Sequence, residues 1–105
     1  MQGYLLTFYT QKNRGHAGVS LAEWIVGEAR RLGVRGATLA GGSEGFGHDG
    51  RFHSDGFFDL EDKPLQVVLA VTEEELEKLM ASIREQNLRV FYTKARIEFG
   101  YTCDA

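Results

Sequence analysis

The sequence predicts one α+β domain in which two helices alternate with four strands, in the order βαββαβ. Two observations carry this prediction. Two segments open with the polar signals that start helices, and runs of apolar or alternating residues typical of strands flank both of them. The chain of 105 residues has the length of a single domain with one hydrophobic core, so 1–105 is expected to fold as one unit.

The first strand and the first helix come early in the chain. Residues 3–10, GYLLTFYT, form a β-branched and aromatic run that predicts a strand. Ser20 can cap the following helix, and Glu23 is placed to complete a capping box with it. Apolar residues then recur with a helical period, and Gly33 is expected to end the helix. The buried face of this helix should consist of Ala22, Ile25, Val26, Ala29 and Leu32.

Two strands are expected between the helices. Residues 34–41, VRGATLAG, follow the first helix directly, and 65–71, LQVVLAV, form the near-continuous apolar run of a strand in the centre of a sheet. Pro64 stands at the entry of the second of these strands, where a missing N–H does least harm. Residues 57–60 are candidates for an outward extension of the same strand.

The second helix and the last strand complete the order. Thr72 and Glu75 are placed to form a second capping box, and Asn87 is expected to end the helix. The buried stripe of this helix should consist of Leu76, Leu79, Met80 and Ile83. The last strand, at 89–99, has alternating residues. One side would carry Phe91, Thr93, Ala95, Ile97 and Phe99, and the other side would carry Tyr92, Lys94, Arg96 and Glu98.

This order predicts the ferredoxin-like fold, because right-handed crossovers place both helices on one face of a four-stranded antiparallel sheet. The other face of the sheet is left without a cover. Phe8, Val68 and Ala70 are expected to add to the apolar residues on that face. Exposed apolar surface of this kind marks an interface, so we expect a homo-oligomer in which sheets pack on sheets. A monomer with a mixed sheet face is the alternative.

Composition and charge favour a cytoplasmic protein with no nucleic-acid partner. The net charge of −3 gives no electrostatic reason to expect nucleic acid. Cys103 is the single cysteine, so no disulfide can form within the chain, which fits a reducing compartment. The sequence has neither a signal-peptide pattern nor an apolar run of the roughly 20 residues that a membrane span needs. Direct membrane insertion is therefore not expected.

The glycine-rich stretch 41–56, GGSEGFGHDGRFHSDG, falls between the second and third strands and predicts a long hairpin loop with a function. Its histidines and carboxylates match no structural zinc spacing, so no metal is predicted, and a metal site is the alternative. No nucleophile is recognisable with a base and an orienting group, so we expect no enzyme and assign no catalytic residue. The candidate metal ligands are His48, Asp49, His53 and Asp55, with His16 from another loop.

Residues 33–50, GVRGATLAGGSEGFGHDG, resemble the PII signal-transduction superfamily, in which a Gly-x-x-Gly-x-Thr segment leads to Gly-Phe-Gly at the base of the mobile T-loop. Over most of its length the chain is similar to the PII-like domain-of-unknown-function 190 family. The matching segments are GYLLTFYT, LAEWIVGEARRLGVRGATLAGGSEGFG and LEDKPLQVVLAV. The resemblance implies a homotrimer with a ferredoxin-like core, a role in signal transduction, and a small ligand in the clefts between subunits.

In PII proteins that ligand is an adenine nucleotide, contacted by the backbone around the Gly-Phe-Gly turn. Glycines suit this role because their backbone can approach phosphate oxygens closely. Carried over by position, the ligand-binding residues would be Thr38, Glu44, Gly45, Phe46, Gly47, His48 and Asp49. Five basic residues could add contacts to an anion, with solvated surface as the alternative for each: Lys12, Arg14, Arg51, Lys94 and Arg96.

Two departures from the PII pattern bear on the ligand. PII proteins follow Gly-Phe-Gly with arginine and glutamine, whereas this chain has His48 and Asp49. The glycine-rich phosphate loop that PII proteins place after the second helix is absent here. Because Asp49 would repel a triphosphate, AMP or a cyclic nucleotide is expected rather than ATP with magnesium.

The resemblance also implies a partner protein. As PII T-loops do, the loop 42–56 would dock on a membrane channel or transporter, and a ligand in the cleft could order this loop. Phe46, which is flanked by glycines and so lacks helix or strand support, is interpreted as an anchor of the loop's base. The alternatives are a protein-interaction module that binds no nucleotide and a metal-binding protein similar to CutA.

Overall fold

The computed structural model of the chain describes residues 1–41, 44–46, 52–54 and 63–104, and for 44–46 and 52–54 it describes the backbone. Two helices and the strands of three sheets make up this part of the chain. The main sheet consists of β1 (Gln2–Gln11), β4 (Ala37–Gly41), β7 (Pro64–Val71) and β8 (Phe91–Glu98). The helices are α1 (Leu21–Arg31) and α2 (Glu73–Glu85). Two short hairpins pair β2 (Gly15–His16) with β3 (Val19–Ser20), and β5 (Glu44–Phe46) with β6 (Phe52–Ser54).

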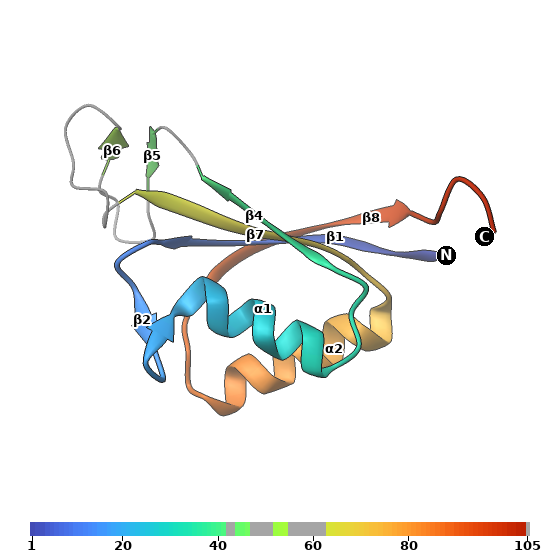
Figure 1. Ribbon diagram of the computed structural model, residues 1–105, viewed down its shortest axis with the longest axis horizontal. Helices are drawn as coiled ribbons and strands as arrows, with labels where there is room; N and C mark the ends of the chain where they lie inside the picture. Colours follow the sequence, from blue (N-terminus) through green and yellow to red (C-terminus); the bar gives the residue numbers. More distant parts are fainter. Residues whose placement is uncertain (42–43, 47–51, 55–62, 105) are drawn as a thin grey trace.

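The main sheet has the strand order β4-β7-β1-β8, and each neighbouring pair is antiparallel. Both helices lie on one face of this sheet, and no helix of the described residues covers the other face (Figure 1). The predicted ferredoxin-like fold is therefore confirmed. Strands far apart in the sequence are neighbours in this order, since β1 pairs with both β7 and β8.

Strand alternation divides the main sheet into a helix-covered face and an open face. Leu6 and Phe8 of β1 and Val67, Leu69 and Val71 of β7 turn toward the helices, and each is at most 1% exposed. The helices complete the core with one apolar stripe each, as their periodicity predicts. The buried residues of these stripes are Leu21, Ala22, Ile25, Ala29, Leu76, Leu79 and Ile83.

The prediction that Phe8 lies on the open face is wrong. Phe8 pairs with Val67, and both side chains are buried beneath the helices. The reason is the two-residue period of the strand, which places Phe8 on the same side as Leu6 and puts Thr7 on the opposite side. Val68, which pairs with Thr7, does lie on the open face, and so does Ala70.

Both helices begin at the predicted cap residues and end as predicted, but the capping box predicted at Ser20 and Glu23 is only half formed. The Ser20 side chain accepts a hydrogen bond from the Glu23 N–H at 3.1 Å, although the return bond of a full capping box is not recorded there. At the other end Gly33 has a φ of 83°, and the N–H groups of Gly33 and Val34 bond back to the last turn of α1. This is the Schellman arrangement. Asn87, with a φ of 56°, ends α2 in the same way.

These helix ends explain why two strands start later than predicted. Val34 donates its N–H to Ala29, and Leu88 donates its N–H to Ile83, so both residues still belong to helix termini. As a result β4 begins at Ala37 instead of residue 34, and β8 begins at Phe91 instead of residue 89. The proposed strand extension at 57–60 lies outside the described residues.

The start of α2 carries a complete capping box. Thr72 Oγ1 accepts from the Glu75 N–H at 3.2 Å, and Glu75 Oε1 accepts from the Thr72 N–H at 2.9 Å. We expect Thr72→Ala to lower the free energy of unfolding by about 1 kcal/mol. The Glu75 N–H loses its acceptor, and the reciprocal bond from the Thr72 N–H to Glu75 is weakened with it. Urea unfolding followed by circular dichroism measures this. Thr102→Ala, on the exposed C-terminal segment, is the control that should leave the value unchanged.

The same carboxylate predicts a pH dependence of stability. Burial alone would raise the pKa of Glu75, but the hydrogen bond from Thr72 and the Arg35 guanidinium at 3.1 Å outweigh it and lower the pKa below its ordinary 4.5. A lowered folded-state pKa contributes stability that is present above pH 4.5 and is lost as the pH falls through the folded value. Glu75→Gln should therefore destabilise the protein at pH 7 and have progressively less effect below pH 4.5. A difference that stays constant down to pH 2.5 or so would contradict this assignment.

Candidate functional site

One end of the molecule, called here the loop end, gathers the segments from which the site was predicted. β1 and β4 finish there, and β7 and β8 begin there, as the pairs Gln11 with Pro64 and Tyr9 with Phe91 show. The β2–β3 and β5–β6 hairpins lie at this end, whereas both chain termini lie at the other (Figure 1). The backbone N–H of Lys12 donates to the Lys63 carbonyl at 3.0 Å, which fixes the end of the long loop to the start of the β2–β3 hairpin.

The first half of the Gly-Phe-Gly motif belongs to the β5–β6 hairpin. Gly45 pairs with His53, and Phe46 pairs with Phe52. The long hairpin loop expected after β4 therefore has a hydrogen-bonded ladder of its own. Phe46 lies within strand β5, so the expectation that it lacks strand support is wrong. The reason is that the flanking glycine does not interrupt the pairing. Residues 44–46 lie opposite residues 54–52 in one continuous antiparallel register.

Several predicted site residues cannot be placed with this hairpin. Gly47, His48, Asp49, Arg51 and Asp55 lie outside the described residues. For Glu44, Phe46 and His53 the structure gives strand pairing only. Their roles as ligand-binding, anion-binding or metal-binding residues therefore stay predictions.

Thr38 is placed on the open face of the sheet. It lies on β4, pairs with Val68 of β7, and is exposed. The same strand continues to Gly41 and leads directly into the long loop. Thr38 is thus on the element that carries the loop's base, but on the sheet face opposite the helices.

The structure separates the predicted cations into two groups. Lys12 and Arg14 lie at the loop end, next to the β2–β3 hairpin. Lys94 and Arg96 instead lie over the ring of Tyr4, with the charged groups 5.0 and 5.8 Å from its centroid. Arg96 pairs with Tyr4, seven residues before the end of β1, which is a distance of roughly 20 Å along the strand. Within one chain, the two groups do not form one anion site.

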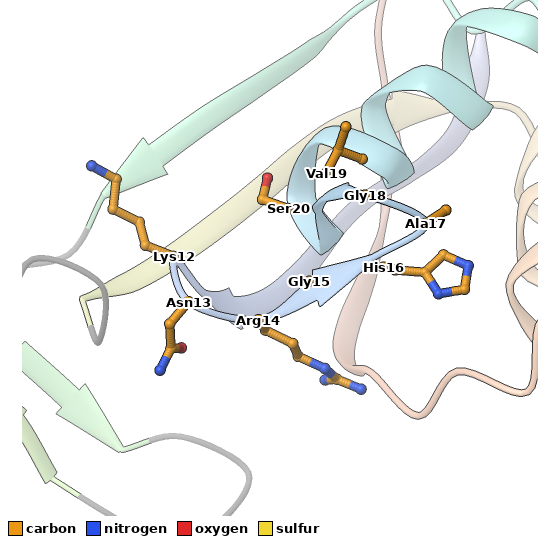
Figure 2. Close-up of a pocket in the computed structure, with 9 residues that line it drawn as sticks. All are labelled: Lys12, Asn13, Arg14, Gly15, His16, Ala17, Gly18, Val19 and Ser20. Carbon is orange, nitrogen blue, oxygen red and sulfur yellow. The ribbon is translucent and has the colours of Figure 1, made fainter.

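The β2–β3 hairpin was not predicted from the sequence. Its turn consists of Ala17 and Gly18, both with positive φ (54° and 85°), as a two-residue hairpin turn requires. The signal in the sequence was the single glycine at the second turn position, and strands of two residues are too short to show alternation. Residues 12–20 line an open hollow of about 540 Å³ (Figure 2).

Two side chains attach this hairpin to the segment that connects α2 with β8. Arg14 Nη2 donates to the Arg89 carbonyl at 2.6 Å, and His16 Nε2 lies 3.3 Å from Gln86 Oε1. The His16 ring also meets the Trp24 ring edge-on, with centroids 5.0 Å apart. Burial lowers the pKa of Arg14, because the charged guanidinium loses part of its hydration. The candidate metal ligand His16 thus takes part in packing the hairpin.

The open face of the sheet exposes large apolar side chains, alongside the exposed threonines Thr38 and Thr93. Leu5 is 41% exposed and Phe91 is 59% exposed, and the Phe91 ring packs against Tyr9 with centroids 5.7 Å apart. The predicted alternation of β8 is confirmed, because Phe91 pairs with Tyr9 on this face while Tyr92 pairs with the buried Phe8 on the other. By their register, the residues on this face are Gly3, Leu5, Thr7, Tyr9, Gln11, Thr38, Ala40, Pro64, Gln66, Val68, Ala70, Phe91, Thr93, Ala95 and Ile97.

The structure also bears on a metal site and on a membrane-spanning helix. Among the described residues, no group of three or more histidine, cysteine, aspartate or glutamate side chains could hold a metal ion. The metal alternative also involves residues beyond that part of the chain, so it remains a hypothesis. Neither helix in the described ranges has the length and apolar character needed to cross a bilayer.

Comparison with known proteins places the chain in a family. The model of the DUF190 family, described as "Uncharacterized ACR", matches residues 3–99. Curated proteins gave no match. Solved structures that share the fold include two PII-like proteins. One is CPII, a nitrogen regulatory PII-like protein from Thiomonas intermedia K12, bound to ADP, AMP and bicarbonate. It has a TM-score of 0.71 at 19% identity, over 96% of this chain and 91% of CPII.

The other is a putative PII-like signaling protein from Thermus thermophilus, with a TM-score of 0.64 at 18% identity, over 91% of this chain and 87% of that one. At identities this low the likeness establishes the fold alone, which is the ferredoxin-like arrangement. The family match spans nearly the entire chain, including β1, both helices and β8. The chain therefore belongs to the DUF190 family.

Proposed function

We propose that this protein is a PII-like regulatory protein that binds an adenine nucleotide at the loop end. The observation that carries the proposal is the shared fold with CPII, whose structure holds ADP, AMP and bicarbonate. The loop end supports it, because Gly45 lies in a strand at the base of the long loop, and a glycine lets a phosphate group approach the backbone closely. The proposed role is regulatory, without catalysis, and the single cysteine favours the cytoplasm as its site of action.

We further propose that the ligand lies in clefts between the subunits of a homotrimer. The open face of the sheet supports this assembly, since Leu5 and Phe91 expose large apolar side chains that a second copy could cover. Within one chain, Lys94 and Arg96 lie far from Lys12 and Arg14. A cleft between copies is the arrangement in which cations from both groups could contact one ligand.

Calorimetric titration with AMP, ADP, ATP and cyclic AMP tests the nucleotide. We expect AMP or cyclic AMP to bind, with ATP and magnesium binding more weakly because of the charge of Asp49. Gly45→Val should reduce this binding at least tenfold, because a branched side chain keeps phosphate away from the backbone while remaining acceptable in a strand. Gly36→Ala, whose added methyl group would meet open space, is the control and should bind normally. Absence of binding by all four nucleotides would refute the proposal.

The partner of the loop is the second part of the proposed function. The loop 42–56 would contact a membrane channel or transporter, and the nucleotide would change that contact. Deletion of 48–55 should abolish co-purification with the transporter, and AMP should alter the recovery with the full-length loop. Equal recovery with and without the deletion would show that the loop is not the contact.

A further inference from the structure

The β2–β3 hairpin is held between two parts of the loop end. Lys12, which precedes the hairpin, donates its N–H to the Lys63 carbonyl, where the long loop returns to the sheet. The Arg14 carbonyl accepts from the Leu21 N–H at 2.8 Å, and the Arg14 side chain bonds to Arg89. These contacts fix Arg14 in the corner between the hairpin, the start of α1 and the start of β8. Figure 2 shows the Arg14 side chain leaving the hairpin toward the α2–β8 connection.

The Arg14 guanidinium is incompletely satisfied in this corner. Nη2 bonds to Arg89, but Nη1 has almost no contact with solvent and no hydrogen-bond partner. The ion pairs recorded for the described residues do not include Arg14. A buried charged donor without an acceptor is costly, because it has given up its water without a replacement. Among the described residues, Arg14 therefore has no anionic partner.

Thr10 Oγ1 is a second buried polar atom without a hydrogen-bond partner, and it also lies toward the loop end. Across the described ranges, two buried side-chain polar atoms have no partner, Thr10 Oγ1 and Arg14 Nη1. They are four residues apart, on either side of the turn that joins β1 to the hairpin. Unsatisfied buried polar groups are few in native proteins, and one of these two residues, Arg14, lines the hollow formed by residues 12–20, which points to a ligand that completes the site. Lys12 lines the same hollow and adds positive charge to it.

We propose that the hairpin 12–20 is an oxyanion-binding element in which Arg14 is the principal residue, and that its ligand is the phosphoryl group of the bound nucleotide. This inference rests on the proposed function and assigns the phosphate contact within it. A guanidinium suits the role, because its planar fork can keep one N–H on the Arg89 carbonyl and present another to a phosphate oxygen. Binding would then also hold the α2–β8 connection more firmly. Lys94 and Arg96, which lie over Tyr4, are not part of this element.

The test compares ligands with and without the phosphoryl group. Adenosine, AMP, inorganic phosphate and bicarbonate are titrated separately into the wild-type protein, Arg14→Gln and Arg84→Gln. Arg84 is the matched control, since it is an exposed arginine in the last turn of α2. We expect Arg14→Gln to weaken AMP binding about tenfold or more and to leave adenosine binding unchanged, because one charge-assisted contact is lost. Arg84→Gln should match the wild type with every ligand.

The outcomes separate this inference from the function on which it rests. Normal AMP binding by Arg14→Gln, or an equal loss of AMP and adenosine binding, overturns the inference and leaves nucleotide binding intact. If the wild type binds phosphate or bicarbonate through Arg14 but no nucleotide or adenosine, the anion element stands, its source is a free oxyanion, and the proposed function fails. If the wild type binds none of the four ligands, both fail.

A second variant covers the possibility that Arg14→Gln does not fold. Arg14→Lys keeps the charge but cannot hold the Arg89 carbonyl and a phosphate oxygen with one planar group. We expect it to fold, as judged by its thermal midpoint, and to bind AMP more weakly than the wild type with adenosine unaffected. Wild-type affinity of Arg14→Lys for AMP would overturn the assignment of Arg14 as a forked contact.

Discussion

Leu5→Glu is expected to convert the proposed trimer into folded single chains. Leu5 lies on the open face of the sheet, opposite Ala70 and Ala95, and 41% of it is exposed. If sheets pack on sheets, each copy would bring one carboxylate into an apolar interface, where a charge without a partner costs several kcal/mol. The fold itself should survive, because the side chain points away from the core. Sedimentation velocity measures the mass, and circular dichroism confirms the fold.

The chain offers a closely matched control for this substitution. Leu39 on β4 is 47% exposed, but it pairs with the buried Val67 and so points to the helix-covered side at the edge of the sheet. Leu39→Glu makes the same chemical change at a similar exposure and should leave the assembly intact. If nucleotide lies between subunits, Leu5→Glu should also lose AMP binding while Leu39→Glu keeps it. The same mass for Leu5→Glu and the wild type would show that the open face is not the interface.

Gly3→Ala should destabilise the protein strongly, although the substitution adds only one methyl group. A Cβ at residue 3 would lie 1.9 Å from the Val71 carbonyl oxygen and 3.0 Å from the Phe99 ring. The oxygen belongs to the backbone of β7, so relief requires β1 to move away from a central strand of the sheet. We expect a loss of about 3 kcal/mol or more in the free energy of unfolding, which is a large share of a small domain's stability.

The control for Gly3→Ala is Gly27→Ala. Gly27 is exposed in the middle of α1, and a Cβ there would have no neighbour within 4 Å. Since alanine is the better helix former, this change should raise the free energy of unfolding by about 0.5–1 kcal/mol. Urea unfolding measures both variants. Wild-type stability of Gly3→Ala would mean that β1 and β7 do not approach as closely as described.

The sequence correctly predicts those parts of the fold that depend on residues close together in the chain. Thr72 and Glu75 form their capping box, Gly33 and Asn87 end their helices with positive φ, and the two-residue period of β8 assigns its faces correctly. Each of these depends on residues within a few positions of one another. The order of elements then leaves one common topology.

The errors arise where a position depends on a partner strand or on too few residues. Phe8 was placed on the open face because an aromatic strand residue fits either side, and the register with Val67 decides which one. The β2–β3 hairpin has two residues in each strand, so no periodicity could reveal it. Arg14 was one of five similar cations in the sequence, and only its buried Nη1 distinguishes it from the others.

The candidate site residues do not all lie at one end of the molecule. Gly45 and Phe46 of the Gly-Phe-Gly motif lie in the hairpin at the loop end, and Lys12 and Arg14 lie there too. Lys94 and Arg96 do not, since strand register and not sequence spacing determines how far along the sheet a residue lies. The assembly that would bring both groups of cations together involves other copies of the chain, which no pattern within one sequence can place.

The mass of the wild-type protein in solution decides whether the proposed ligand site can exist, because that site is a cleft between copies. Sedimentation equilibrium at micromolar concentrations, with and without AMP, gives this mass without reference to shape. We expect three chains of 11.7 kDa, or about 35 kDa. A mass of 11.7 kDa under both conditions would contradict it.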